Sequence, residues 1–368
     1  MEMERQNKKM QVWNLLAEKI RKLVEESVSN PEELQEIRIR TGQPLLIQMK
    51  GQERVLPDPV HPYLVTKEDI GETMGYICHY SLYAYENELK QGFITVEGGH
   101  RVGVAGKVII ENEKVKNIQY ISSLNVRISH EVLGCADALI PYITENKQIC
   151  HTLIISPPCC GKTTLIRDLI RQISDGNEYI KGCSVGVVDE RSELGGCYLG
   201  IAQNHLGTRT DILDCCPKAE GMIMLIRSMA PRVIAVDEIG TSEDIHAIEY
   251  AMQCGCRLIA SVHSLDMDEA SKKPILGDLI RRRMFQRYVV LGQDHGPGKI
   301  REIYDERGVC CAEISRMFSD PVGDDRSRMD VWKRTSELSG RIESFSQNYR
   351  TNKRRITVCR TSAFGNFL

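Results

Sequence analysis

The fold is decided by the stretch Leu153-Ile-Ile-Ser156-Pro157-Pro158-Cys159-Cys160-Gly161-Lys162-Thr163-Thr164. A short apolar run stops at a turn, and a helical pattern follows, which indicates a strand, a loop and a helix. A nucleotide triphosphate requires inward-pointing backbone N–H groups, an ammonium on its outer phosphates and a hydroxyl on Mg²⁺. In this stretch Lys162 would supply the ammonium and Thr163 the hydroxyl. We therefore predict that residues 156–164 form a nucleotide-binding phosphate loop.

The match to the pattern GxxxxGK[ST] is incomplete. Ser156 occupies the first glycine position, and Cys159 occupies a second position that is often glycine in such loops. Pro157 and Pro158 partly offset this departure, because they preset φ and lower the entropy that is lost when the loop becomes ordered.

Two acidic residues follow a later apolar run, Val233-Ile-Ala-Val236, in the manner of a Walker B motif. Asp237 is expected to hold Mg²⁺, and Glu238 is expected to orient the attacking water and take its proton. An intervening strand also ends in acids, at Asp189 and Glu190. Acids after a strand are often no more than a solvated loop, but three strands that deliver polar groups to one sheet edge favour a shared site.

Two further polar residues have both functional and structural interpretations. His263 ends the strand after the Walker B motif, where related ATPases have a polar sensor of the γ-phosphate. It is equally well explained as a structural histidine. Arg209 lies in the segment Gly207-Thr-Arg-Thr-Asp211, where it would either contact a neighbouring subunit or form a structural salt bridge.

The region from 151 to 292 alternates strand and helix patterns, which predicts an α/β fold with a mostly parallel sheet and helices on both faces. Ligands of such sheets bind at the carboxyl ends of the strands, where the polar motifs fall. The strands are expected at 151–156, 184–189, 232–237, 257–262 and 287–292, with a last edge strand from 299. The helices are expected at 163–174, 217–229, 242–253 and 275–284.

The first third of the chain predicts a smaller α+β domain. Its helices are expected at 12–28 and, after a capping box at Thr66 and Asp69, from there through Leu82. Its strands are expected at 36–40, 45–49, 92–96, 101–106, 108–110 and 120–128. A polar stretch near Pro141 to Gln148 separates this domain from the phosphate loop.

Beyond about Ser319 the pattern is lost, and residues 319–368 contain ten basic and six acidic residues. We expect a disordered basic tail there, with a nucleic-acid-binding arm or frame-shifted read-through as alternatives. The predicted domains are therefore 1–145, a RecA-like P-loop ATPase domain at 146–318, and the tail.

The composition, 42% hydrophobic and 27% charged, is that of an ordinary globular protein, and the net charge of −2 gives no overall basic field. The start of the chain is polar, and no apolar run reaches the roughly 18–20 residues of a membrane span, so we expect a cytoplasmic protein. The 14 cysteines lack zinc or redox spacing, and we expect them to be reduced thiols.

Taken together, these residues resemble the stage III sporulation protein AA family, which is similar to the hexameric ATPases of type II and type IV secretion. The resemblance covers about residues 10–317. It rests on Glu36-Ile-Arg-Ile-Arg, Gly98-Gly-His-Arg-Val-Gly, Asn125-Val-Arg-Ile, the phosphate loop, Val188-Asp-Glu-Arg-Ser-Glu-Leu, Gly207-Thr-Arg-Thr-Asp-Ile-Leu-Asp, Val236-Asp-Glu-Ile-Gly and Lys299-Ile-Arg-Glu-Ile-Tyr-Asp.

The resemblance implies an ATPase of the mother-cell cytoplasm that uses ATP and Mg²⁺, forms a hexameric ring and powers a channel complex between mother cell and forespore. It assigns Asp189-Glu190 to the acidic box and His263 to the histidine box of those ATPases. Arginines of the N-terminal domain reach the phosphates in such relatives, which points to Arg101 and Arg127. The chain departs from the family pattern at Cys159 and after about residue 318.

Two alternatives stay open from the sequence. RecA-like cores also drive nucleic-acid motors, although residues 1–318 contain no basic stripe with interleaved aromatics, and we expect no nucleic-acid partner. A nucleotide-gated scaffold without turnover is the other alternative, and Cys159 gives it some support.

Overall fold

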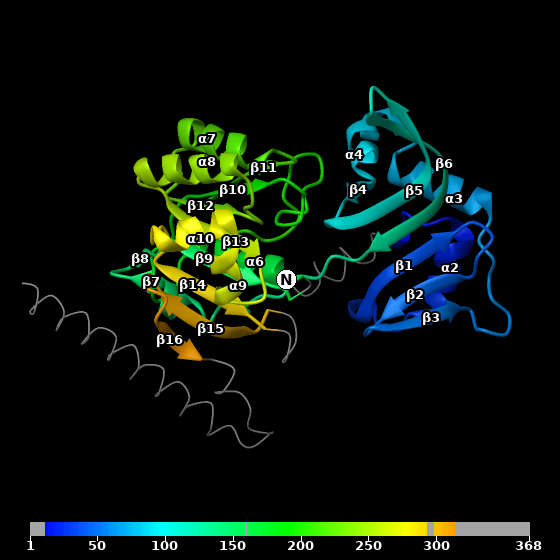
Figure 1. The fold of residues 1–368 in the computed structure, drawn as a ribbon. Coiled ribbons are helices and arrows are strands. Elements are labelled where there is room, and N and C mark those ends of the chain that lie inside the picture. Colours follow the sequence, from blue (N-terminus) through cyan, green and yellow to red (C-terminus); the bar gives the residue numbers. More distant parts are fainter. Residues whose placement is uncertain (1–11, 159, 293–297, 314–368) are drawn as a thin grey trace, which may run out of the picture. The chain divides into compact units, whose positions relative to one another are not determined.

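The computed structural model describes residues 12–158, 160–292 and 298–313 (Figure 1). These residues contain a six-stranded sheet, an eight-stranded sheet and a two-stranded hairpin. The predicted tail at 319–368 and the position of Cys159 lie outside the described residues, and the division of the chain at 145 and 318 stays a prediction.

The six-stranded sheet has the order β3-β2-β1-β6-β5-β4, and all its neighbouring strands are antiparallel. Alternate residues are buried throughout β2 and from Ile37 onward in β1, as expected for strands with one face against a core. The two strands predicted at 101–106 and 108–110 form one long strand, β5. The strand β3 was not predicted. The strands are β1 (Leu34–Arg40), β2 (Leu45–Met49), β3 (Gln52–Leu56), β4 (Phe93–Val96), β5 (His100–Glu111) and β6 (Lys114–Arg127).

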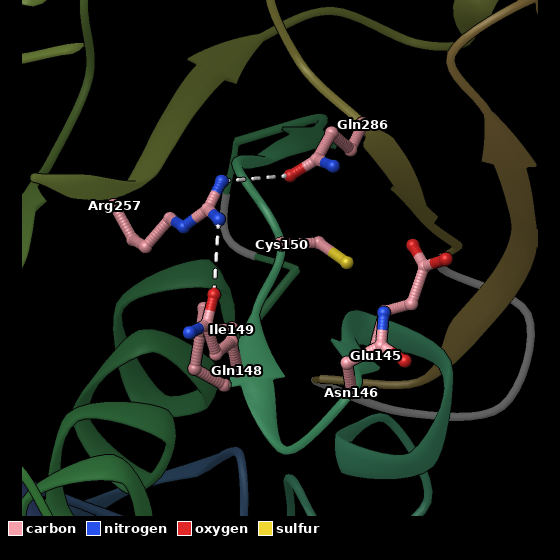
Figure 2. A pocket seen from close by; sticks show the side chains of 7 residues that line it. All are labelled: Glu145, Asn146, Gln148, Ile149, Cys150, Arg257 and Gln286. Atoms are coloured by element: carbon pink, nitrogen blue, oxygen red, sulfur yellow. Dashed lines mark hydrogen bonds between the residues drawn. The ribbon is translucent and has the colours of Figure 1, made fainter. Parts of the chain in front are cut away.

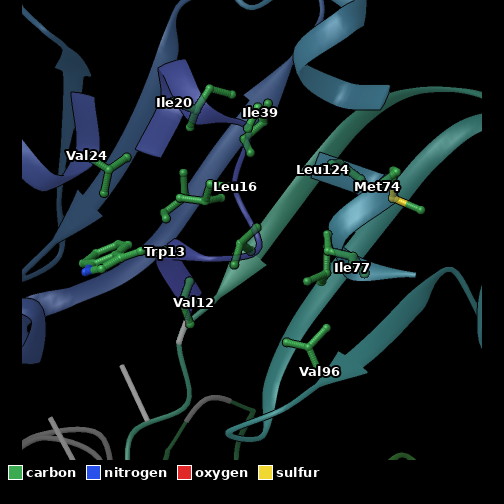
Figure 3. Close-up of a cluster of buried hydrophobic side chains, with 14 of the residues drawn as sticks. Val12, Trp13, Leu16, Ile20, Val24, Ile39, Met74, Ile77, Val96 and Leu124 are labelled. Atoms are coloured by element: carbon green, nitrogen blue, oxygen red, sulfur yellow. The ribbon is translucent and has the colours of Figure 1, made fainter. Parts of the chain in front are cut away.

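Helices cover the buried face of this sheet, and Figure 3 shows side chains from helices and strands meeting in one apolar cluster. The predicted helix at 12–28 is broken, because its regular part begins only at Glu18. The capping box at Thr66 and Asp69 is confirmed, but its helix ends at Ile77, before Leu82. The helical segments are α2 (Glu18–Ser27), η1 (Pro31–Glu33), α3 (Lys67–Ile77), η2 (Leu82–Tyr85) and α4 (Glu86–Gln91).

The eight-stranded sheet has the order β11-β10-β12-β13-β9-β14-β15-β16. The pairs from β11 through β14 are parallel, and β15 runs antiparallel to β14, which confirms a mostly parallel sheet. The predicted edge strand near 299 is not an edge, because β16 follows it. The strands are β9 (Thr152–Ser156), β10 (Val185–Asp189), β11 (Thr210–Asp214), β12 (Val233–Val236), β13 (Arg257–His263), β14 (Arg287–Leu291), β15 (Ile300–Asp305) and β16 (Cys310–Glu313).

Four of the helices around this sheet fall near their predicted places, and the predicted helix at 275–284 is preceded by a separate short one. Pro274 begins that later helix, since proline is tolerated in a first turn but not in a helix interior. The helices are α5 (Ile140–Ile143), α6 (Lys162–Asp175), α7 (Lys218–Ser228), α8 (Ser242–Gln253), α9 (Met267–Lys272) and α10 (Pro274–Arg281). The hairpin consists of β7 (Thr144–Glu145) and β8 (Gln148–Ile149).

The sheet order explains why distant motifs converge. The strands β10, β12, β13 and β9 are consecutive neighbours and parallel, so their carboxyl ends meet at one edge. His263 at the end of β13 is directly opposite Ser156 at the end of β9. Among the residues with a described structure, no helix has the length and apolar character that a membrane span needs.

Candidate active site

The phosphate loop leads from β9 into α6. Ser156 is buried, and its hydroxyl donates to the carbonyl oxygen of Pro157 at 2.8 Å. Gly161 has φ 78°, a left-handed conformation that suits glycine, and precedes a helix whose N-terminus has no side-chain cap. The first N–H groups of α6 therefore keep their capacity to bind an anion. Cys160 is buried, and Pro158 and Thr164 also lie on this loop.

Lys162 and Asp237 form a buried ion pair. The Lys162 side chain has 7% exposure, and its Nζ lies 2.5 Å from Oδ1 of Asp237. The Ser261 hydroxyl donates to the same oxygen at 2.6 Å, and the Thr163 hydroxyl lies 3.5 Å from Oδ2. Burial alone would raise the pKa of Asp237, but the charge and hydrogen bond of Lys162, together with Ser261, hold it below its ordinary value. Asp237 is therefore an anion in the folded protein.

Glu238 stands beside this pair in an uncommon backbone conformation, with φ 45°. Its N–H donates to the Ser261 hydroxyl at 3.0 Å, so Ser261 fixes both Asp237 and Glu238. Oε2 of Glu238 lies 3.1 Å from a guanidinium nitrogen of Arg191 and 3.5 Å from Nε2 of His263. Arg191 was not predicted as a site residue. In the sequence, the one feature that points to Arg191 is its position directly after Asp189 and Glu190.

His263 connects two parts of the site. Its Nδ1 lies 3.3 Å from the carbonyl oxygen of Ser156, while its other ring nitrogen faces Glu238. Lys273 donates to the carbonyl oxygen of His263 at 2.5 Å. The structure thus places His263 between the phosphate loop and Glu238, as its position at the end of a central strand predicts.

The acids of the second predicted motif have different surroundings. Asp189 is buried, and burial raises its pKa to about 6, although the N–H groups of Gly195 and Glu193 oppose the rise by donating to its carboxylate. Asp189 thereby anchors the loop that follows β10. Glu190 forms an ion pair with Lys218 at the start of α7. This ion pair joins Glu190 to α7 and not to the phosphate loop, so its expected role in catalysis stays a prediction.

The three predicted arginines have separate partners. A guanidinium nitrogen of Arg101 lies 3.0 Å from Oε1 of Glu193, and the group lies 3.5 Å from the centre of the Phe93 ring. Nε of Arg127 lies 3.5 Å from Oε1 of Glu36, within the six-stranded sheet. Arg209 donates to the carbonyl oxygen of Ser174 at 2.9 Å, at the C-terminal end of α6. The structure brings Arg101 next to the acidic segment after β10. Arg127 and Arg209 have partners outside that segment.

The family described as "Sporulation stage III, protein AA" matches residues 6–311. The chain belongs to this family. Stage III sporulation protein AA of Bacillus subtilis (strain 168) is 45% identical over 277 residues, which are 75% of this chain and 88% of that protein. The family assignment confirms the resemblance that the phosphate loop and the acidic motifs indicated.

Two solved structures have a similar fold. The ATPase DotB of Legionella pneumophila matches with a TM-score of 0.52 and 14% identity, over 88% of this chain and 86% of that structure. The pilus retraction motor PilT with bound ADP matches with a TM-score of 0.55 and 13% identity, over 84% of this chain and 95% of that structure. At such low identity the likeness concerns the fold alone, and it confirms the predicted P-loop NTPase fold.

Proposed function

We propose that this protein binds MgATP, hydrolyses it, and uses the energy to drive a channel complex between mother cell and forespore during endospore formation. The observation that supports hydrolysis best is the Lys162–Asp237 ion pair with Glu238 beside it. A phosphate-binding ammonium, a metal-binding carboxylate and a second carboxylate meet at one sheet edge, which is the residue set that phosphoryl transfer to water requires.

The residues fit a bound nucleotide and its metal. The uncapped N-terminus of α6 and the left-handed turn at Gly161 present backbone N–H groups to phosphate oxygens. Thr163 and Asp237, whose oxygens already lie 3.5 Å apart, would hold Mg²⁺. When bound, Mg²⁺ neutralises charge on the transferring phosphate.

Lys162 has two partners in this scheme. Without nucleotide its ammonium is neutralised by Asp237, so the buried charge is not left unpaired. With nucleotide bound, the ammonium would contact the outer phosphates, and Asp237 would be free to hold Mg²⁺. The Ser261 hydroxyl keeps Asp237 in place during this exchange, because it donates to the same carboxylate.

Glu238 acts as the general base. Its carboxylate accepts a proton from the water that attacks the γ-phosphate. Arg191 and His263 hold the carboxylate in the absence of substrate. Both contacts involve partly exposed side chains, so they break at little energetic cost when water and phosphate enter.

The proposal includes assembly of the protein into a homo-oligomeric ring, specifically a hexamer. The ring acts on the cytoplasmic face of the membrane in the mother cell. Neighbouring subunits would complete each site with arginines, and Arg101, Arg127 and Arg209 are the residues that we propose for this role. Native mass spectrometry combined with turnover measurements tests it. Full turnover by a monomer would contradict the ring.

The deciding experiment compares Glu238→Gln with Glu243→Gln, a matched loss of one exposed carboxylate at the start of α8. We expect Glu238→Gln to keep ATP binding and to lower turnover by about 10²–10⁴-fold, the usual worth of a general base. The control should hydrolyse ATP at nearly the parent rate. Parent-like turnover of Glu238→Gln would reject the assignment, and normal function in sporulating cells without turnover would favour a scaffold. Stimulation by single-stranded nucleic acid would favour a nucleic-acid motor.

A further inference from the structure

A cavity of about 600 Å³ lies at the opposite, amino-terminal edge of the eight-stranded sheet. Four basic side chains line it: Lys147, Lys181, Arg232 and Arg257. A smaller cavity of about 210 Å³ shares Arg257, Gln148 and Ile149 with it, and Figure 2 shows the residues around that smaller space. None of these residues belongs to the nucleotide site.

The sheet order explains why the four cations gather. Lys147 precedes β9, Lys181 precedes β10, Arg232 precedes β12, and Arg257 begins β13. These four strands are consecutive neighbours and parallel, so their amino ends lie side by side. With about 4.8 Å between neighbouring strands, the amino ends of the four strands span about 14 Å. The other end of β13, six residues away, is His263, so about 20 Å separates this edge from the nucleotide site.

The guanidinium of Arg257 is held in place by neutral partners. One of its nitrogens donates to the side-chain oxygen of Gln148 at 3.2 Å, and the other donates to that of Gln286 at 3.4 Å, as Figure 2 shows. These amides orient the group without cancelling its charge. Arg257 is therefore a preorganised cation on the wall of the cavity.

Carboxylates are scarce around these cations. Among the described residues, no Asp or Glu lines the larger cavity. Glu145 lines the smaller one and lies 3.9 Å from a guanidinium nitrogen of Arg287. The positive charge of the larger cavity thus has no internal counter-charge, unlike that of Lys162.

Lys147 has a backbone conformation that lysine rarely adopts. The β7–β8 hairpin turns through Asn146 and Lys147, which have φ 52° and 60°. Two left-handed residues form a tight turn in which glycine is favoured at the second position. A lysine there costs up to about 1–2 kcal/mol. A strained lysine that lines a basic cavity is the kind of outlier from which a binding role is inferred.

We propose that this cavity binds a small molecule that carries two or more phosphate groups. Its volume lies within the range of small-molecule sites, and the side chains of Ile149, Ile180 and Val233 give it apolar walls. Four cations that line one cavity match several linked anionic groups better than a single carboxylate. Arginine in particular presents a fork that fits phosphate oxygens.

The probe is inorganic tripolyphosphate, and the readouts are calorimetry and alkylation of Cys183. Cys183 is a half-buried free thiol that lines the larger cavity. Burial raises the pKa of its thiol and the nearby Arg232 partly offsets this, so the thiol senses charge in the cavity. Measurements use the full chain with Lys162→Ala, which removes the ammonium of the phosphate loop, and circular dichroism verifies that this destabilised chain is folded under the conditions of the assay.

We expect tripolyphosphate to slow alkylation of Cys183 in the Lys162→Ala chain. The double change Lys181→Gln/Arg232→Gln should weaken binding by at least about 10-fold, since two charge-assisted contacts are lost. Both side chains are exposed, so folding should be preserved. Arg227→Gln/Lys272→Gln, an equal loss of exposed charge elsewhere, should bind like the parent. Arg257→Gln should weaken binding as well.

Three results would overturn the proposal. The first is binding that disappears with Lys162→Ala alone, which would assign it to the phosphate loop. The second is equal weakening by the cavity pair and the control pair, which would indicate nonspecific charge attraction. The third is tighter binding of a glutamate-rich peptide than of tripolyphosphate, which would indicate an acidic protein segment. Because binding is measured without hydrolysis, none of these results depends on the proposed ATPase activity.

Discussion

At the carboxyl ends of β9, β10, β12 and β13 a buried lysine is paired with an aspartate, whereas at the amino ends of the same strands four basic side chains line a cavity. Lys162 is buried, and its charge is balanced by Asp237. Three of the cations at the other end, Lys147, Lys181 and Arg232, are exposed. Burial explains the difference, because an unpaired charge is tolerated in water but not in a protein interior.

The comparison separates two kinds of charged residue. Charges at the carboxyl ends support both folding and chemistry, so substitutions there should disturb stability and turnover together. Charges at the amino ends support binding alone, so substitutions there should leave stability unchanged or improve it. Each of the following expectations tests this separation.

The largest effect is expected for Lys162→Ala. Turnover should fall by at least about 10²–10³-fold, the worth of a group that stabilises transition-state charge. Stability should fall by about 3–5 kcal/mol, because the buried carboxylate of Asp237 loses its partner. Urea unfolding and ATP turnover check both. A variant that loses turnover at unchanged stability would contradict a structural role for the pair.

Asp189→Asn tests a carboxyl group buried at the carboxyl end of β10. With a folded pKa of about 6 against an ordinary 3.8, the folded protein holds a proton that the unfolded chain releases between these values. The stability from this proton is complete below about pH 4 and is lost as the pH rises through 6. Between pH 4 and 7, the free energy of unfolding of the parent should therefore fall by about 2–3 kcal/mol relative to that of the variant. Urea unfolding at both pH values measures this, and a constant difference would reject the elevated pKa.

Ser261→Ala should have a moderate effect. The hydroxyl accepts from the N–H of Glu238 and donates to Asp237, so its loss leaves a partly buried donor without a partner. We expect a loss of about 1–3 kcal/mol in stability, together with reduced turnover. The conservative variant Ser261→Thr should recover part of both if the hydroxyl is responsible. No recovery, with a loss confined to stability, would indicate packing instead.

The smallest effect is expected for Lys147→Gly at the amino-terminal edge. Glycine adopts the left-handed conformation without strain, so stability should rise by up to about 1 kcal/mol. Tripolyphosphate binding should weaken at the same time, while ATP turnover stays at the parent level. Thermal unfolding and calorimetry report the two changes. A destabilised variant would show that Lys147 supports the hairpin.

The sequence predicted the central strands well, because each is a buried run of branched apolar residues bounded by turn or helix patterns. It missed β11 and β16. Every residue of β11 is only half-buried, and its ends are polar, so no apolar run marks it. The strand β16 is short, and its residues Cys310 and Cys311 are exposed. Edge strands of this kind are determined by the neighbours that they pair with, which a local pattern does not contain.

The site was predictable where chemistry concentrates residues locally. Lys162, Asp237 and Glu238 lie in motifs of adjacent polar residues, and the parallel sheet then brings them together. The contact between Arg191 and Glu238 was not predictable, since it depends on how the loop after β10 is anchored by Asp189. The amino-terminal cavity was missed for the same reason. Its cations come from four separate segments of the chain, and none belongs to a motif.

The hydrogen bond from the Glu238 N–H to the Ser261 hydroxyl gives the chain a built-in reporter. An amide held by a buried acceptor exchanges its hydrogen slowly, and it exchanges faster when that acceptor moves. Ser261 also holds Asp237, which in the proposed function changes partners when Lys162 turns to a phosphate. Deuterium uptake at this one peptide group should therefore follow the filling and emptying of the site in real time, without labels or substituted residues.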